Sequence, residues 1–169
     1  SWPALHSRDS AQCCRNNPTT NMAVFHRGEV QVQEKMGVRV SAEQLGQQML
    51  RDRLNQQHAD FFSEIPFLAL AARDSDASDA RVWCSLVSGP PTPALGPQPA
   101  GRVTDDTTLS ILQPPGTGDA LHDQLLPGRP VGVVGVMLHN RRRNRVNGVV
   151  GTSQAGDGVD LKVIQSFGN

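Results

Sequence analysis

One stretch of the chain constrains the fold more than any other: residues 131–150, in which an apolar run leads into four arginines and straight back into a second apolar run. The first run, Val131–Leu138, and the second, Val146–Thr152, are rich in valine, which favours strands. Two such runs joined by a short polar segment predict an antiparallel hairpin. Because guanidinium groups gather at its mouth, the hairpin is expected to hold an anion.

Apolar segments bounded by turn residues predict about six strands in all. The first two strands form a hairpin, because the Asp and Ser residues between them favour a turn. The segment Gly89–Gly101 carries too many prolines to supply a ladder of backbone donors, so it is expected to be a loop. The expected strands are Phe67–Ala72, Val82–Ser88, Thr107–Leu112, Val131–Leu138, Val146–Thr152 and Val159–Phe167.

Helices are predicted only before these strands. Loosely spaced apolar residues in Met22–Met36 predict one short helix. Ser41, followed three residues later by Gln44, has the pattern of a capping box and predicts a second helix that runs through Gln57. A helical turn is expected at His58–Ile65, before a proline that cannot continue it. Helices first and antiparallel strands afterwards predict an α+β fold, built around a small closed or half-closed barrel.

Length and composition narrow the possible classes of protein. The chain has 169 residues, enough for one domain of usual size, which we assign to residues 22–169. The polar, aperiodic residues 1–21 predict a mobile extension. A net charge of zero and an aromatic content of 4% argue against a general polyanion binder. No apolar run of 18 residues and no secretory signal are present, so a cytoplasmic protein without a membrane partner is expected.

Few residues suggest a metal or a nucleophile. Cys13 and Cys14 do not have the spacing of a disulfide framework or of a zinc site, which indicates a reducing compartment. Cys84 has no nearby histidine suggested by the sequence, so we interpret it as a small buried hydrophobe. His26 and Glu29 are three residues apart on a predicted helix, but no third ligand accompanies them. Neither a catalytic thiol nor a metal centre is therefore predicted.

Four segments are each characteristic: Phe25–Glu29 with Gln33, Arg81–Pro91, Arg142–Gly148 and the terminal Gln165–Asn169. Together they resemble the pyridoxamine 5′-phosphate oxidase-related, FMN-binding split-barrel family, over roughly residues 22–169. The likeness is closest to the subgroup of flavin-nucleotide-binding proteins, in which Phe-Gly-Asn is followed by Cys-Pro-Lys-Tyr. We therefore expect the chain to be truncated at its C-terminus, and its first residue, Ser1, also suggests a piece of a longer product.

The resemblance implies N-terminal helices followed by a six-stranded antiparallel split β-barrel, with FMN bound between the two subunits of a homodimer. It also implies contacts from basic and hydroxyl side chains at strand ends, which suits a phosphate because guanidinium forks match its oxygens. The residues expected to bind FMN are Trp83, Ser85, Leu86, Ser88, Gly89, Arg142, Arg143, Arg145 and Asn147.

Strand alternation divides the arginines. Arg141, Arg143 and Arg145 are expected on one face and Arg142 on the other, so all four cannot serve one phosphate. The alternative is that these arginines form a solvated edge that resists aggregation. His139, beside them, is expected either to touch the cofactor or to be an exposed turn residue.

The strand Val82–Ser88 is the second candidate element. Alternation puts Trp83 and Ser85 on one face and Leu86 and Ser88 on the other. At the end of the strand, Gly89 would let the backbone approach a ligand closely. The alternative is that Trp83 belongs to the core and that the serines only line a wall.

Departures from the family pattern bear on the activity. Where the subgroup has an aromatic step after Gly-Pro-Pro, this chain has the Pro-rich residues 92–99, which alters one wall of the implied site. Tyrosine is absent, and the oxidase's substrate-phosphate residues have no match, so pyridoxamine 5′-phosphate oxidation itself is not predicted.

The function implied by the resemblance is an FMN-binding oxidoreductase or electron-transfer domain. A nicotinamide-dependent reductase module, downstream or separate, would supply its electrons. The alternative is a noncatalytic flavin-binding or dimerisation barrel that has lost redox activity. Nucleic-acid binding through the arginines is disfavoured, because no aromatic residues are available nearby to stack on bases.

Overall fold

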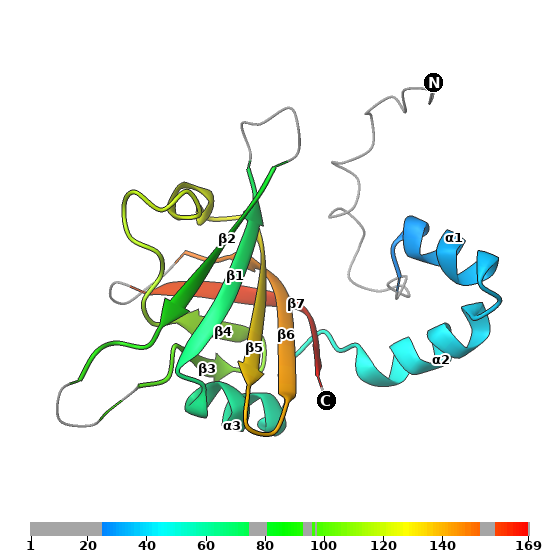
Figure 1. Cartoon of the computed structure of the whole chain (residues 1–169), viewed down its shortest axis with the longest axis horizontal. Helices are drawn as coiled ribbons and strands as arrows, with labels where there is room; N and C mark the ends of the chain where they lie inside the picture. The colour runs from blue at the N-terminus through cyan, green and yellow to red at the C-terminus, as the bar shows by residue number, and fades with distance from the viewer. Residues whose placement is uncertain (1–24, 75–80, 93–95, 97, 153–157, 169) are drawn as a thin grey trace. The chain divides into compact units, whose positions relative to one another are not determined.

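The computed structural model describes residues 25–74, 81–92, 96, 98–152 and 158–168 (Figure 1). Two compact units divide the chain, residues 1–43 and residues 44–169, and α3 with every described strand belongs to the second. The extension predicted for residues 1–21 lies outside the described residues. The helices are α1 Arg27–Lys35, α2 Arg39–Met49 and α3 Gln56–Glu64, with a 3-10 turn, η1, at His122–Gln124. The strands are β1 Phe67–Arg73, β2 Val82–Ser88, β3 Gly101–Asp105, β4 Thr108–Ile111, β5 Pro130–Met137, β6 Arg142–Val150 and β7 Val159–Gly168.

The strands form one antiparallel sheet in the order β2-β1-β5-β6-β7-β4-β3. The α+β class, with helices before strands, is confirmed. The expected six-stranded closed or split β-barrel is wrong, because the sheet has seven strands and is not closed. Its two edge strands, β2 and β3, do not pair with each other within the described residues.

The strand that sequence reasoning missed is β3. It has only five residues and begins at the end of the Pro-rich loop. It also carries Arg102 and Asp105, and short, charged edge strands give little apolar signal. The described residues of the predicted loop, up to Ala100, indeed lie outside the strands, and β3 occupies the interval before Thr107 to which no element was assigned.

The first helix is confirmed, and its start explains a pair of residues that resembled metal ligands. His26 Nδ1 accepts a hydrogen bond from the backbone N–H of Gly28 at 3.0 Å, and the His26 N–H donates to Glu29 Oε2 at 2.7 Å. These bonds satisfy N–H groups that a helix end leaves unpaired. His26 and Glu29 therefore cap α1. None of the described helices is long and apolar enough to cross a membrane.

The second helix has different ends from those predicted. It begins at Arg39, so Ser41 lies inside it and does not cap it, and it ends at Met49 instead of Gln57. Beyond it, the backbone of Arg51 pairs with Ser166 of β7 in both directions, with N···O distances of 3.0 and 2.7 Å. This long-range pairing holds the segment extended, which a local sequence pattern does not reveal. The next helix, α3, starts at the cap residue Asn55, close to the predicted position.

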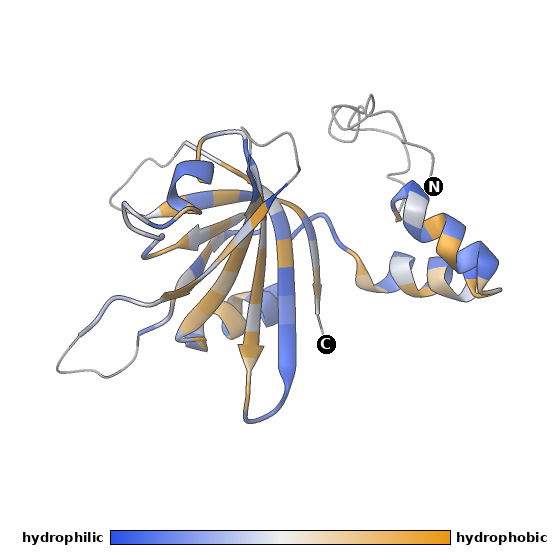
Figure 2. Ribbon diagram, turned by 45° about the horizontal axis from the view of Figure 1, so that its top comes forward, coloured by the Kyte–Doolittle hydropathy of each residue, from blue (hydrophilic) through white to orange (hydrophobic). Residues whose placement is uncertain are grey.

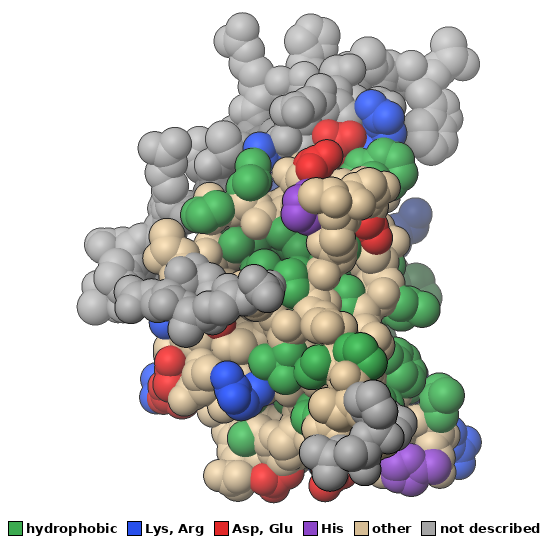
Figure 3. Space-filling model, turned by 90° about the vertical axis from the view of Figure 1, so that its left-hand side faces the viewer, with side chains coloured by type: hydrophobic (Ala, Val, Ile, Leu, Met, Phe, Trp, Pro, Cys, Tyr) green, Lys and Arg blue, Asp and Glu red, His purple; other side chains and the backbone are tan. Residues whose placement is uncertain are grey.

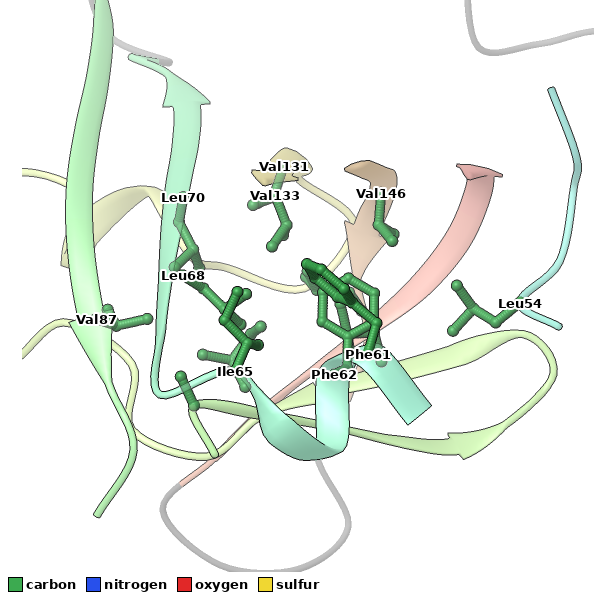
Figure 4. Close-up of a cluster of buried hydrophobic side chains, with 14 of the residues drawn as sticks. Leu54, Phe61, Phe62, Ile65, Leu68, Leu70, Val87, Val131, Val133 and Val146 are labelled. Carbon is green, nitrogen blue, oxygen red and sulfur yellow. The ribbon is translucent and has the colours of Figure 1, made fainter. Parts of the chain in front are cut away.

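The hydrophobic core lies between α3 and one face of the sheet (Figure 4). Phe61 and Phe62 meet edge to face, with ring centroids 5.3 Å apart. At Gly135 of β5 a Cβ atom would lie 2.7 Å from Phe61 Cε1, so the glycine lets the ring approach the strand. We call this side of the sheet, together with its continuation along each strand, the inner face. Its core residues include Leu68, Leu70, Val87, Val131, Val133 and Val146.

A histidine is buried in this second unit. His58, on α3, is 3% exposed, and its Nδ1 lies 2.6 Å from Asn55 Oδ1. Its Nε2 is also buried and has no hydrogen-bond partner among the described residues. Burial lowers the pKa of His58, and the positive charge of Arg51 lowers it further.

Because the pKa of His58 is lowered in the folded state, we expect the protein to lose stability in mild acid. In the unfolded chain it takes up a proton near pH 6.5, whereas in the folded state it does so only at a lower pH. The free energy of unfolding should therefore fall as the pH drops below about 6.5, until the folded pKa is passed. Urea titrations between pH 7.5 and 5 should show a smaller decline for His58→Gln than for the wild type. His139→Gln, at an exposed turn position, should decline as the wild type does; equal slopes for all three proteins would contradict the assignment.

Candidate functional site

Most of the arginines that were predicted at the mouth of the hairpin belong to a strand. Only Arg141 lies in the β5–β6 turn, where its φ is 59°, and the Asn140 side chain accepts a hydrogen bond from the Arg142 N–H at 3.0 Å. Strand β6 therefore begins at Arg142, four residues before the predicted start. Figure 2 shows the first half of β6 as hydrophilic beside the hydrophobic β5.

Alternation along β6 sorts its side chains between the two faces. Arg143, Arg145 and Asn147 are exposed, whereas Asn144 and Val146 are buried. Arg142 points inward, with its guanidinium 6.0 Å from the centre of the Phe61 ring. The expected separation of Arg142 from Arg143 and Arg145 is thus confirmed, although Arg141 is outside the strand.

We call the side of β2, β1, β5, β6 and β7 opposite α3 the outer face. Cross-strand pairing arranges it in two rows. The first row is Leu86, Ala69, Val134, Arg145 and Phe167, and the second is Cys84, Ala71, Gly132, Asn147 and Gln165. In both rows the residues of β1 and β5 are small or are valine. We call the part of the outer face over β1 and β5, where the side chains are short, the floor. The polar side chains of β6 project along one side of it.

Two contacts order the polar side of this floor. The guanidinium carbon of Arg145 lies 5.5 Å from the centre of the Phe167 ring, within the range of a cation–π interaction. Asn147 Nδ2 donates a hydrogen bond to Gln165 Oε1 at 2.9 Å. Within the described part of the chain, neither Arg143 nor Arg145 forms an ion pair with a carboxylate. Both positive charges are thus available to an external anion.

The structure does not bring all the predicted cofactor residues together. Leu86, Ser88, Arg143, Arg145 and Asn147 have their side chains on the outer face, whereas Trp83, Ser85 and Arg142 have theirs on the inner face. That these residues contact a cofactor stays a prediction.

The inner-face residues of β2 have partners within the chain. Trp83 packs against the core, and its Nε1 donates to Asp74 Oδ2 at 3.2 Å. Ser85 Oγ donates to Asp119 Oδ1 at 2.7 Å. The alternative reading of Trp83 as a core residue therefore fits its surroundings.

The surroundings of Gly89 and Cys84 differ from those predicted. Gly89 is buried, and a Cβ there would collide with the carbonyl oxygens of Gln98 and Pro99, so the backbone that comes close is the chain's own. Cys84 is exposed, which makes its interpretation as a buried hydrophobe wrong. It points to the outer side of an edge strand, where no described element covers it. His139 is also exposed, in the turn before β6.

Sequence reasoning missed the roles of Gln165 and Phe167. The pairing of β6 with β7 shifts between Asn147 and Gly148, which leaves an extra residue in β7. At Gly148 a Cβ would collide with the carbonyl oxygen of Lys162, so the glycine permits the close approach at this bulge. The bulge resets the alternation of β7 and brings Gln165 and Phe167 beside Asn147 and Arg145. Strict alternation of side chains along β7 would not predict this change of register.

Comparisons with known proteins find only distant structural similarities. No family model matches the sequence, and no curated protein matches it. A protein of Lactobacillus delbrueckii, provisionally named a pyridoxamine 5′-phosphate oxidase, aligns at 15% identity over 69% of this chain and 95% of its own, with a TM-score of 0.48. HupZ of Group A Streptococcus aligns at 14% identity over 68% of this chain and 93% of its own, with a TM-score of 0.46. Likenesses at this level assign neither a membership nor an activity.

Proposed function

We propose that this chain binds FMN on the outer face of its sheet, as a homodimer, and works as an FMN-dependent oxidoreductase or electron-transfer domain. The observation that carries the proposal is the pair Arg143 and Arg145, which project without a carboxylate partner among the described residues beside a floor of small side chains. The same face offers suitable contacts for the three chemical parts of a flavin nucleotide: a phosphate, a planar ring and a polar ring edge.

The phosphate is the part that the arginines suit. A phosphate monoester carries close to two negative charges at neutral pH, and guanidinium groups donate to its oxygens in pairs. Arg143 and Arg145 are two residues apart on one strand, so their side chains leave the same face about 7 Å from each other. Each charge-assisted hydrogen bond contributes about 1.5–3 kcal/mol. Two such residues are enough to select a phosphorylated ligand over a neutral one.

The floor and the amide pair suit the ring. Ala69 and Ala71 have no side chain beyond Cβ and Gly132 has none at all, so a planar group can lie close to the backbone over the adjacent strands β1 and β5, which are about 4.8 Å apart. The hydrogen bond between Asn147 and Gln165 leaves Asn147 Oδ1 as an acceptor and Gln165 Nε2 as a donor. The pyrimidine edge of a flavin presents alternating acceptors and a donor, which such a pair can satisfy.

A second copy of the chain would complete the site. An open sheet face alone cannot bury a ligand to the 70–90% usual for cofactor sites. The edge strand β2 exposes Leu86 to 74% and Val82 to 64%, and it carries no charged residue. Hydrophobic side chains reach the surface on the side of the molecule drawn in Figure 3. Pairing two outer faces would cover Leu86, Val82 and the flavin ring together.

The chemistry of the site would come from the flavin, which supplies electron or hydride transfer when bound. The described residues contain no group of three or more His, Cys, Asp and Glu side chains able to hold a metal, and none of their ion pairs involves Arg143 or Arg145. The chain's own residues would bind the phosphate, orient the ring and exclude water. A nicotinamide-dependent reductase module would deliver the electrons.

The test is an FMN titration followed by fluorescence quenching, with the oligomeric state read by light scattering in the same samples. We expect micromolar or tighter binding by a dimer, and at least a tenfold loss, about 1.4 kcal/mol, in Arg143→Ala. The control is Arg102→Ala, an exposed arginine on β3 at the other end of the sheet order, which should bind as the wild type does.

The outcomes separate the candidate functions. A folded dimer that binds no FMN overturns the proposal. Stoichiometric FMN that is never reduced by a nicotinamide nucleotide, with or without a reductase, selects the alternative of a noncatalytic flavin-binding or dimerisation module. Tight, salt-dependent binding to an oligonucleotide instead of FMN would turn the arginines into a nucleic-acid site.

A further inference from the structure

The end of β7 follows β6 residue by residue on both faces. The pairs are Asn147 with Gln165, Val146 with Ser166, Arg145 with Phe167 and Asn144 with Gly168. On the outer face, Gln165 and Phe167 each contact the side chain of their partner. The end of β7 therefore not only extends the sheet but also contacts two side chains of the proposed site.

The inner side of the same segment is anchored. Ser166 is fully buried, and its Oγ donates to the Arg53 carbonyl oxygen at 2.6 Å. Its backbone pairs in both directions with Arg51. Gly168 lies against the buried Asn144, since a Cβ at Gly168 would collide with Asn144 Oδ1 and lie 2.8 Å from the Arg143 carbonyl oxygen. Contacts on this side therefore fix where Phe167 and Gln165 stand on the other.

A fixed ring beneath an exposed guanidinium has a physical consequence. An arginine on a sheet surface has many rotamers, and it loses side-chain entropy when it grips a ligand. The Phe167 ring favours those rotamers in which the Arg145 guanidinium lies over it. Part of the ordering is then complete before an anion arrives, which strengthens binding without a new contact to the ligand.

We propose that Phe167 is a positioning residue for Arg145, and that it raises the affinity of the outer face for the phosphate group of its ligand. Gln165 plays the corresponding part for Asn147. The identity of the ligand rests on the proposed function, whereas the pairing of ring and guanidinium does not. In this proposal Phe167 acts through its contact with Arg145 and not through a contact with the ligand.

The test compares Phe167→Leu, which keeps an apolar side chain but removes the ring, with Phe167→Tyr, which keeps the ring. Each full-length protein is titrated with FMN and with riboflavin, which lacks the phosphate. We expect Phe167→Leu to weaken FMN about threefold to fivefold, the size of an exposed cation–π contact. Riboflavin affinity should not change, and Phe167→Tyr should restore FMN affinity. Equal weakening of both flavins, or no rescue by tyrosine, would give Phe167 a merely structural role and overturn the proposal.

A second measurement keeps this outcome distinct from failure of the proposed function. In the free protein, the Arg145 Hδ and Hε resonances should be shifted upfield by the Phe167 ring, and the shift should vanish in Phe167→Leu. If the wild type binds neither flavin, the proposed function fails; titration with inorganic phosphate then decides the role of Phe167. Weaker phosphate-induced shifts at Arg145 in Phe167→Leu than in the wild type support positioning, and identical titrations or an absent ring-current shift overturn it.

Discussion

Replacing Phe62 with alanine is expected to lower the free energy of unfolding by about 3–5 kcal/mol, the usual cost of removing a fully buried phenylalanine ring. Phe62 is 0% exposed and lies with Phe61 between α3 and the sheet (Figure 4). Because α3 is the one described α-helix wholly within residues 44–169, its aromatic side chains supply much of the cover of the inner face. Removing the ring loses its transfer free energy and leaves a cavity that a seven-stranded sheet cannot readily close.

Urea denaturation followed by tryptophan fluorescence and by circular dichroism measures this loss. The matched control is Ser63→Ala, the next residue of the same helix, which is exposed and bonds only to the Asp60 carbonyl within α3. It should stay within about 0.5 kcal/mol of the wild type. A cost below about 1 kcal/mol for Phe62→Ala would mean that α3 does not pack against the sheet as described.

The second large effect is expected at Gly89. A Cβ there would overlap the carbonyl oxygens of Gln98 and Pro99 and lie 2.5 Å from the Gln98 carbonyl carbon. Backbone atoms cannot rotate away as a flexible side chain can, and the Gly89 N–H is also tied to the Pro66 carbonyl at 3.0 Å. Gly89→Ala should therefore force the two segments apart, at a cost of about 3 kcal/mol.

Gly116→Ala is the control for this substitution, since a Cβ at that position would meet nothing within 4 Å. It should be neutral or slightly stabilising, because alanine narrows the conformational freedom of the unfolded chain. Thermal unfolding of the three proteins at one pH gives the comparison. If Gly89→Ala melts with the wild type, the loop does not close over the end of β2 as described, and Gly89 returns to being a candidate for close approach to a ligand.

Local sequence patterns were sufficient where local interactions decide the structure. The bounds of β2 agree with the prediction, and β1 and β7 each extend one residue beyond it, because apolar runs between clear turn signals leave little choice. The faces of Arg142, Arg143 and Arg145 followed from strand alternation alone, once they were placed in a strand.

Long-range interactions decided the rest. The second helix stops at Met49 because Arg51 pairs with Ser166, which is 115 residues further along the chain. Strand β3 forms because its backbone pairs with β4, although its own residues are few and mostly polar. On the outer face, the partners of Arg145 and Asn147 depend on a bulge in β7, and no pattern within either strand specifies the register between them.

The tight turn at Leu138–Arg141 has a consequence for how this hairpin can vary. Met137 pairs with Arg142 across it, so its length sets the phase of every residue on β6 relative to β5. Adding or removing one residue would turn the strand over: Arg142 and Asn144 would point to water, and Arg143 and Arg145 would enter the core. Insertions of two would keep the phase. The turn should thus tolerate the insertion or removal of an even number of residues. An odd number would exchange the side chains of β6 that face the core with those that face water, without any substitution in the sheet.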